Sequence, residues 1–102
     1  MTSKQRSYLI GLSSGLEPIF QVGKAGITPE VIQAVDEALT ARELIKLTLL
    51  RTVGEDEEDA AHTLAERTRS QLVIKIGHKV VLYRANPQKK NGIVFPASKK
   101  RS

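Results

Sequence analysis

The sequence contains no cysteine and no tryptophan, and aromatic residues make up only 4% of its 102 positions. Without cysteine, the chain can form neither disulfide bonds nor thiolate metal sites. It also lacks long apolar runs. The N-terminus has no stretch typical of a signal peptide, and no later segment approaches the roughly 18 apolar residues of a membrane span. We therefore expect a cytoplasmic protein with no membrane association.

Acidic residues are missing from the last third of the chain. Residues 67–102 contain ten Lys or Arg and no Asp or Glu, whereas residues 1–66 contain six basic residues and all eleven acidic ones. Such a segment favours a polyanionic partner, because each cation placed near a phosphate releases condensed counterions. A basic surface kept for solubility would have the same composition, so composition alone leaves both interpretations open.

The length and the 40% of apolar residues suit one domain with one modest core. We expect the domain to cover residues 1–86, with residues 87–102 forming a basic tail. Apolar periodicity predicts three helices and four strands in the order α-β-α-β-α-β-β. The first expected helix covers residues 3–13 and is capped by Ser3, and the second covers residues 29–41 and is capped by Thr28. The third follows the acidic residues 55–59 and ends at Arg69. The expected strands are 18–22, 44–50, 71–76 and 79–85.

Strand–helix–strand connections favour parallel pairing, whereas the last two strands are joined through Gly77-His78 and must form an antiparallel hairpin. The predicted fold class is therefore α/β, with a mixed four-stranded sheet packed with helices. In the second strand, Ile45 and its apolar neighbours alternate with polar residues, so we expect Lys46 to lie on the less buried face.

The tetrapeptide Gly23-Lys24-Ala25-Gly26 separates the first strand from the second helix. Glycines permit close backbone approach, unpaired amides at a helix start bind anions, and Lys24 adds a cation. The pattern fits neither a P-loop nor a dinucleotide fingerprint, because Pro18, Gln21 and Ala25 occupy positions that need Gly, Gly and Ser or Thr. A GxxG turn alone is weak evidence of function, but one in the KH class of domains holds a nucleic-acid backbone.

Three ordered motifs closely resemble the bacterial single-domain CRM (chloroplast RNA splicing and ribosome maturation) family, the YhbY-like proteins. They are GKAGIT before an amphipathic helix, Glu43-Leu44-Ile45-Lys46-Leu47, and IGHKVVLYR at 76–84. The resemblance implies an RNA-binding fold similar to the C-terminal domain of translation initiation factor three, and association with precursors of the large ribosomal subunit. It also implies RNA contact by Gly23, Lys24, Ala25 and Gly26. The basic tail lies outside the recognised pattern.

Other basic side chains on or beside the strands are possible RNA contacts, although each taken alone fits a solvated face nearly as well. These residues are Lys46, Lys75, Lys79 and Arg84. The few aromatics exclude a stacking platform of the RRM type. Phe20 is expected in the core, which leaves Tyr83 as the one stacking candidate.

No catalytic or metal-binding pattern is legible. His62 and His78 lie in different elements, and the acids 55–59 are expected at a helix start because they stabilise its dipole. From the lack of such a pattern we expect a non-enzymatic, cofactor-free monomer, and the family resemblance implies that it binds structured rRNA and assists large-subunit assembly. Two alternatives stay open: a general chaperone or single-strand RNA binder, and a protein-interaction module that uses the basic tail.

Overall fold

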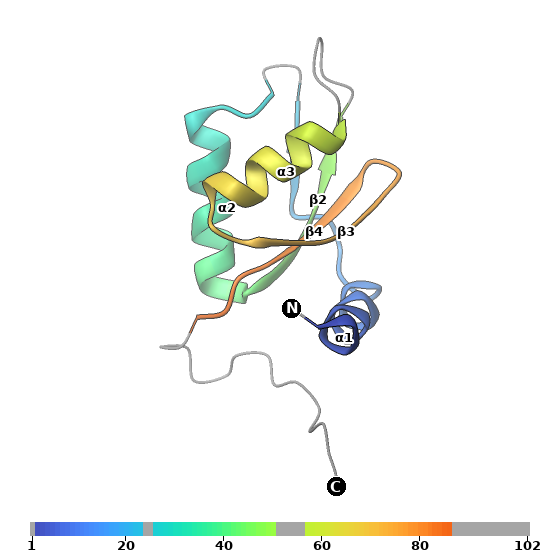
Figure 1. The fold of residues 1–102 in the computed structure, drawn as a ribbon. Helices are drawn as coiled ribbons and strands as arrows, with labels where there is room; N and C mark the ends of the chain where they lie inside the picture. The colour runs from blue at the N-terminus through green and yellow to red at the C-terminus, as the bar shows by residue number, and fades with distance from the viewer. Residues whose placement is uncertain (1, 24–25, 51–56, 87–102) are drawn as a thin grey trace, which may run out of the picture.

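The computed structural model describes residues 2–23, 26–50 and 57–86 (Figure 1). It contains the expected elements in the expected order. The helices are α1 (Ser3–Ser13), α2 (Pro29–Arg42) and α3 (Glu57–Arg67), and the strands are β1 (Phe20–Val22), β2 (Leu44–Leu49), β3 (Gln71–Ile76) and β4 (Lys79–Tyr83).

The four strands form one mixed sheet in the order β1-β2-β4-β3. β1 and β2 are parallel, and β4 is antiparallel to both of its neighbours, β2 and β3. The predicted α/β class with a mixed four-stranded sheet is therefore confirmed. Because the hairpin returns β4 into the space beside β2, β3 runs parallel to β2 without touching it.

The helix ends are set by local hydrogen bonds. α2 begins as predicted, with the Thr28 hydroxyl accepting from the Val31 N–H at 3.2 Å and a proline in the first turn. The predicted cap of α1 at Ser3 is wrong. Thr2 caps the helix, because Thr2 and Gln5 exchange two hydrogen bonds of 3.0 and 3.1 Å that form a capping box.

α3 ends at Arg67, two residues before the predicted end at Arg69. Arg69 adopts a left-handed φ of 57°, and the Ser70 N–H donates to the Ala65 carbonyl at 2.8 Å. This pattern closes the helix end in the manner of a Schellman motif, usually with glycine in place of Arg69.

The two faces of the sheet are covered unequally. α2 and α3 pack on one face, where their apolar side chains and those of the strands form the larger core cluster: Val22, Val35, Leu39, Ile45, Leu47, Leu49, Ala60, Ala61, Leu64, Ala65, Val80 and Leu82. α1 packs on the other face, where the buried cluster among the described residues consists of Leu9, Leu44, Val73 and Val81. In Figure 1, α1 lies near one end of the sheet, apart from the other two helices. We call these the α2/α3 face and the α1 face.

Candidate nucleic-acid interface

The GxxG tetrapeptide begins directly after β1. The Gly26 N–H donates to the Gly23 carbonyl at 3.0 Å, so the two glycines lie at the ends of a tight turn. Gly26 has a left-handed φ of 74°, which glycine adopts without strain. Lys24 and Ala25, predicted to contact RNA together with these glycines, lie outside the described residues.

Gly23 differs from Gly26 in its backbone conformation. Its φ is not in the left-handed region, and a Cβ added there would meet no described atom within 4 Å. Among the described residues, neither backbone strain nor packing therefore requires glycine at position 23. The open space above its Cα leaves the backbone accessible to another molecule.

Three connections meet at this end of the sheet. The Leu50 N–H donates to the Val22 carbonyl at 2.9 Å, and the Leu49 N–H donates to the His78 carbonyl at 2.7 Å. The Gly23–Gly26 turn, the end of β2 and the β3–β4 hairpin are consequently neighbours. Residues distant in the sequence are thus brought to one end of the molecule.

A row of side chains crosses the α1 face at the same end. Gln21 pairs with Thr48, Thr48 with Lys79, and Lys79 with Ile76, and cross-strand partners project from the same face. Gln21, Lys79 and Ile76 are exposed, with Ile76 at 63%, and Thr48 is half-buried. α1 covers the other end of this face and leaves the row open. We call these four residues the open row.

Two of the predicted basic residues lie on the α1 face. Lys79 belongs to the open row, and Lys46 lies two residues before Thr48 on β2, opposite Val81. Lys46 is half-buried on the face without the main core, as predicted from the alternation along its strand. Among the described residues, neither ammonium group has a hydrogen bond or an ion pair, so both are available to a ligand.

Lys75 lies on the opposite face. A register shift between Leu72 and Ile74 reverses the alternation along β3, so Lys75 pairs with Val80 and faces α3. Its ammonium lies 3.6 Å from the Glu57 carboxylate and donates to the Gly77 carbonyl at 2.7 Å. Lys75 is therefore engaged within the chain, and its predicted role in binding RNA stays a prediction.

Glu57 joins the start of α3 to the hairpin. Its carboxylate lies 2.9 Å from His78 Nδ1 as well as near Lys75. The hydrogen bond from His78 is the main reason that the pKa of Glu57 lies below its ordinary value. Desolvation is the second largest effect and opposes it, and the charges of His78 and Lys75 lower the pKa further. The His78 side chain, which the sequence assigns to no metal site, thus contacts the Glu57 carboxylate.

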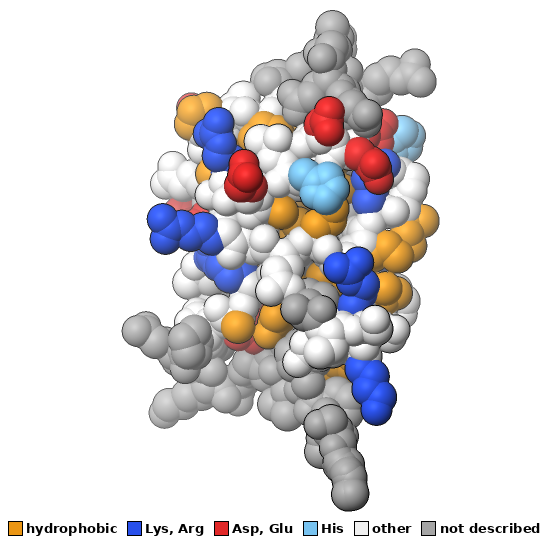
Figure 2. Space-filling model, viewed as in Figure 1, with side chains coloured by type: hydrophobic (Ala, Val, Ile, Leu, Met, Phe, Trp, Pro, Cys, Tyr) orange, Lys and Arg blue, Asp and Glu red, His pale blue; other side chains and the backbone are white. Residues whose placement is uncertain are grey.

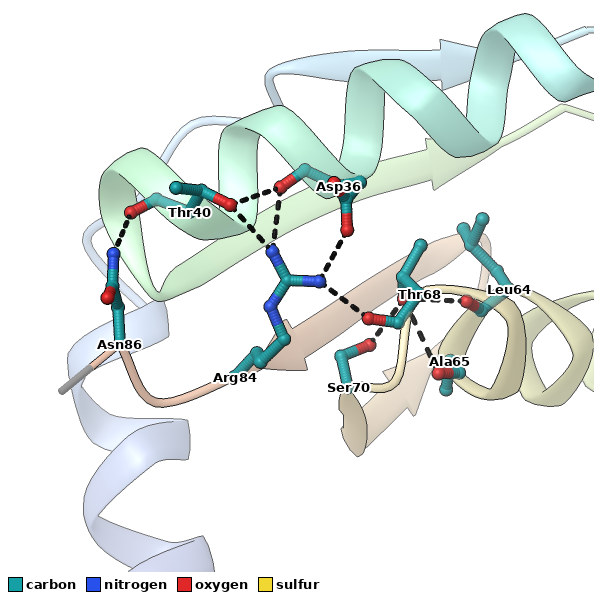
Figure 3. Close-up of polar contacts among 8 residues, drawn as sticks. All are labelled: Asp36, Thr40, Leu64, Ala65, Thr68, Ser70, Arg84 and Asn86. Carbon is teal, nitrogen blue, oxygen red and sulfur yellow. Dashed lines mark hydrogen bonds and ion pairs between the residues drawn. The ribbon is translucent and has the colours of Figure 1, made fainter. Parts of the chain in front are cut away.

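Arg84 is also engaged within the chain (Figure 3). Its guanidinium donates to the Asp36 carboxylate at 2.6 Å, the Asp36 carbonyl at 2.9 Å, the Thr40 hydroxyl at 2.8 Å and the Thr68 carbonyl at 2.6 Å. These acceptors belong to α2 and to the end of α3, and the Arg84 side chain is 22% exposed. Arg84 connects three elements, and its predicted contact with RNA stays a prediction.

Tyr83, the predicted stacking candidate, packs against the smaller cluster on the α1 face. Its pKa lies above the ordinary value because the ring is partly desolvated and because the Glu43 carboxylate is near. The hydroxyl is therefore neutral in ordinary buffers. Its ring offers less open surface than an exposed stacking residue, since it is half-buried.

Acidic and basic residues are divided unequally between the elements, although Lys75 itself faces α3. α1 and the four strands contain no Asp or Glu but five basic residues, Lys4, Arg6, Lys46, Lys75 and Lys79. α2 and α3 contain seven acidic residues, Glu30, Asp36, Glu37, Glu57, Glu58, Asp59 and Glu66, against two basic ones, Arg42 and Arg67. Figure 2 shows acidic side chains gathered over α3. A polyanion is thus attracted to the α1 face and repelled from the helices opposite.

The described residues contain no group of three or more His, Asp or Glu side chains placed to hold a metal ion. Within the same ranges, no helix has the length and apolar character needed to cross a membrane.

The sequence matches a known family of domains. The CRS1/YhbY (CRM) domain matches residues 1–84, and the chain belongs to this family. It is 44% identical over 90 residues to "Probable RNA-binding protein YqeI" of Bacillus subtilis, an alignment that covers 88% of this chain and 94% of the relative. It is 31% identical over 90 residues to a Haemophilus influenzae protein named "RNA-binding protein", covering 88% and 91%.

A solved structure has the same fold. It is the solution structure of "the hypothetical protein SAV1595 from Staphylococcus aureus, a putative RNA binding protein". The TM-score is 0.78 at 43% sequence identity, and the match covers 94% of this chain and 99% of the other. The expected CRM membership is therefore confirmed.

Proposed function

We propose that this protein binds structured rRNA in precursors of the large ribosomal subunit and assists subunit assembly. It acts by binding without catalysis, as a cytoplasmic monomer. The observation that carries the proposal is the position of the Gly23–Gly26 turn beside the α1 face, whose helix and strands contain no Asp or Glu, in a CRM domain whose relatives are named RNA-binding proteins. Association with the large subunit follows from the family resemblance.

The turn supplies contacts to a phosphate. The start of α2 follows it, and the first amides of a helix attract anions. Gly23 lets an RNA backbone approach closely, which accounts for a glycine that the fold itself does not require. Lys24, between the glycines, adds a cation that neutralises one phosphate. This mode of contact depends on backbone geometry and charge more than on base sequence.

The α1 face continues this contact away from the turn. Lys46 and Lys79 lie on this face, and the hydroxyl of Thr48 and the amide of Gln21 can hydrogen-bond sugar or phosphate oxygens. The acids of α2 and α3 disfavour the reverse orientation. Folded RNA would therefore lie across the α1 face with one strand at the turn.

The test of binding uses nuclease-treated, polynucleotide-free protein and fragments of large-subunit rRNA. We expect tight binding at low salt, and competition by unstructured oligonucleotides only at higher concentrations. In cell extracts, the protein should co-sediment with precursors of the large subunit. Equal affinity for unstructured RNA would favour the general chaperone, and no binding in dilute buffer would refute RNA binding altogether.

The role of the turn is tested with Lys24→Ala and Gly23→Ala. We expect Lys24→Ala to weaken binding and to reduce the salt slope by about one phosphate contact. Gly23→Ala should weaken binding while leaving the free energy of unfolding within about 0.5 kcal/mol, because the site is open and unstrained. Arg67→Ala, at an exposed cation at the end of α3, is the control. Unchanged affinity and slope in both turn variants would remove the turn from the interface.

The alternative of a protein-interaction module depends on the tail, residues 87–102, which lies outside the described residues. A chain shortened to residues 1–86 separates the two functions. We expect the shortened chain to keep rRNA binding and subunit co-sedimentation with reduced affinity. A partner that survives nuclease treatment and is lost with the tail would favour the alternative.

A further inference from the structure

A groove opens between β1 and the first two turns of α2. Its lining residues are Phe20, Gln21, Glu30, Val31 and Ala34. β1 is an edge strand, so the groove lies at the margin of the sheet and not inside it. The Gly23–Gly26 turn connects the two elements that form its walls, and the groove therefore begins where the turn contacts RNA in the proposed function.

The walls suit a flat apolar ligand. Phe20, Val31 and Ala34 contribute apolar surface, and each is only partly buried, so part of that surface still faces outward. The edge of β1 presents backbone N–H and C=O groups on its outer side. Aromatic and aliphatic walls with nearby backbone polar groups are how proteins hold unstacked bases.

The charge of Glu30 favours entry of the base of a nucleotide into the groove over entry of its phosphate. The exposed Glu30 lines the groove and, within the described ranges, forms no hydrogen bond or ion pair. Its carboxylate repels phosphate, while the amides and glycines of the adjoining turn attract it. A nucleotide at this place is oriented with its phosphate at the turn and its base toward Glu30. Gln21 belongs both to the groove lining and to the open row, so the two surfaces meet at the edge strand β1.

From this geometry we infer that the groove holds one unpaired RNA base that carries an exocyclic amino group, which donates a hydrogen bond to the Glu30 carboxylate. An ionised carboxylate only accepts hydrogen bonds. The cytosine N4 amino group is a donor, whereas an acceptor oxygen occupies the same position of uracil and faces the carboxylate unfavourably. The inference rests on the proposed function, because it requires RNA at the turn.

The probe is a pair of fluorescently labelled octaribonucleotides, rC8 and rU8. They have the same charge and length, and their pyrimidines differ on one edge of the ring, where cytosine has an N4 amino donor beside a bare N3 and uracil has an O4 acceptor beside an N3–H. We expect the full chain to bind rC8 about five- to tenfold more tightly than rU8, the discrimination that a base-edge contact provides. Equal affinity for the two would overturn the inference while leaving rRNA binding intact. Failure to bind rRNA would instead overturn the proposed function.

Glu30→Gln tests the carboxylate against a matched control. Glu37 is an exposed acid on the same helix outside the groove, so Glu37→Gln removes the same charge elsewhere. Glu37→Gln should bind both octamers slightly more tightly, because it removes a charge that repels phosphate, whereas Glu30→Gln also removes the ionised acceptor of the base contact. Only Glu30→Gln should abolish the rC8 preference, since an amide can both donate and accept. Retention of the preference in Glu30→Gln would refute the role of the carboxylate.

Ala34→Leu tests the groove itself. The larger side chain fills the space between α2 and β1, whereas Ala41→Leu makes the same change at an exposed position of the same helix. We expect Ala34→Leu to lower rC8 affinity to about that for rU8 without changing the salt slope, because phosphate contacts persist. Ala41→Leu should leave both unchanged, and circular dichroism verifies the fold of each variant. An undiminished rC8 preference in folded Ala34→Leu would exclude the groove.

Discussion

The two faces of the sheet differ in how many residues they bury and in the charge of the elements that form them. The α2/α3 face buries twelve residues in the larger core cluster, and its helices are acidic. The α1 face buries four, and α1 and the strands are free of acid. Because the smaller cluster occupies only one end of its face, the open row is left for a ligand. A short chain thus stabilises itself mainly through one face and keeps much of the other available.

The four predicted basic residues show the same division. Lys46 and Lys79, on the α1 face, have no partner among the described residues, whereas Lys75 and Arg84 bind acceptors associated with α2 and α3. A cation already paired within the chain would have to give up those contacts to bind phosphate. The predictions that follow test this division.

The largest expected effect concerns the cores. Leu47 and Leu9 are both fully buried, in the larger and the smaller cluster respectively. Leu47→Ala should lower the free energy of unfolding by about 3–5 kcal/mol, near the upper end for such substitutions. Leu9→Ala should cost about 2–3 kcal/mol, because fewer buried neighbours surround it. Urea denaturation measures both, and equal costs would contradict the proposed inequality of the faces.

The next prediction concerns Arg84. Arg84→Met keeps the apolar stem but leaves the Thr68 carbonyl and the Asp36 carboxylate without their donor. We expect a loss of about 2 kcal/mol in the free energy of unfolding, since partly buried acceptors lose a charged partner. Affinity for rRNA at temperatures where the variant is folded should change less than twofold. A large drop in affinity with little loss of stability would instead place Arg84 at the RNA surface.

Lys46 and Lys79 should behave in the opposite way. The double variant Lys46→Gln, Lys79→Gln should keep the free energy of unfolding within about 0.5 kcal/mol, because neither ammonium is paired among the described residues. The affinity for rRNA should fall several-fold, and the salt slope should decrease by between one and two, at about 0.7 to 0.9 per phosphate. The control is Arg42→Gln, Arg67→Gln on the helices opposite, which should leave the slope nearly unchanged.

Most of the fold could be predicted from local sequence patterns. The order of elements, the start of α2 and the hairpin at Gly77 follow from periodicity, capping and turn chemistry, all of which act over a few residues. The cap of α1 was misplaced by one residue because two adjacent hydroxyl residues compete, and only Thr2 has Gln5 at the required spacing. The end of α3 was missed because Arg69 adopts a conformation usually reserved for glycine.

The candidate interface was less predictable, since it depends on pairing between distant strands. Alternation along β2 correctly separated Lys46 from the core, but the register that aligns Gln21, Thr48 and Lys79 is not encoded within any one strand. The register shift in β3 moved Lys75 to the other face from the one that simple alternation implies. The engagement of Arg84 was also not predictable from the sequence, because its acceptors lie far from it in the sequence and only the fold brings them near its guanidinium.

The smallest expected effect is on the pH dependence of stability and concerns Glu57, which connects α3 to the β3–β4 hairpin. Because its pKa is lowered in the folded chain from an ordinary value of 4.5, its contribution to stability is present above the unfolded pKa and is lost as the pH falls through the folded pKa. Glu57→Gln should therefore flatten the decline in stability below about pH 4.5 relative to the original chain. Glu58→Gln, its exposed neighbour, is the control. Thermal unfolding between pH 3 and pH 7 measures the difference, which should be small because the carboxylate is near solvent. An identical pH dependence in Glu57→Gln would show that its contacts with His78 and Lys75 do not couple α3 to the hairpin in solution.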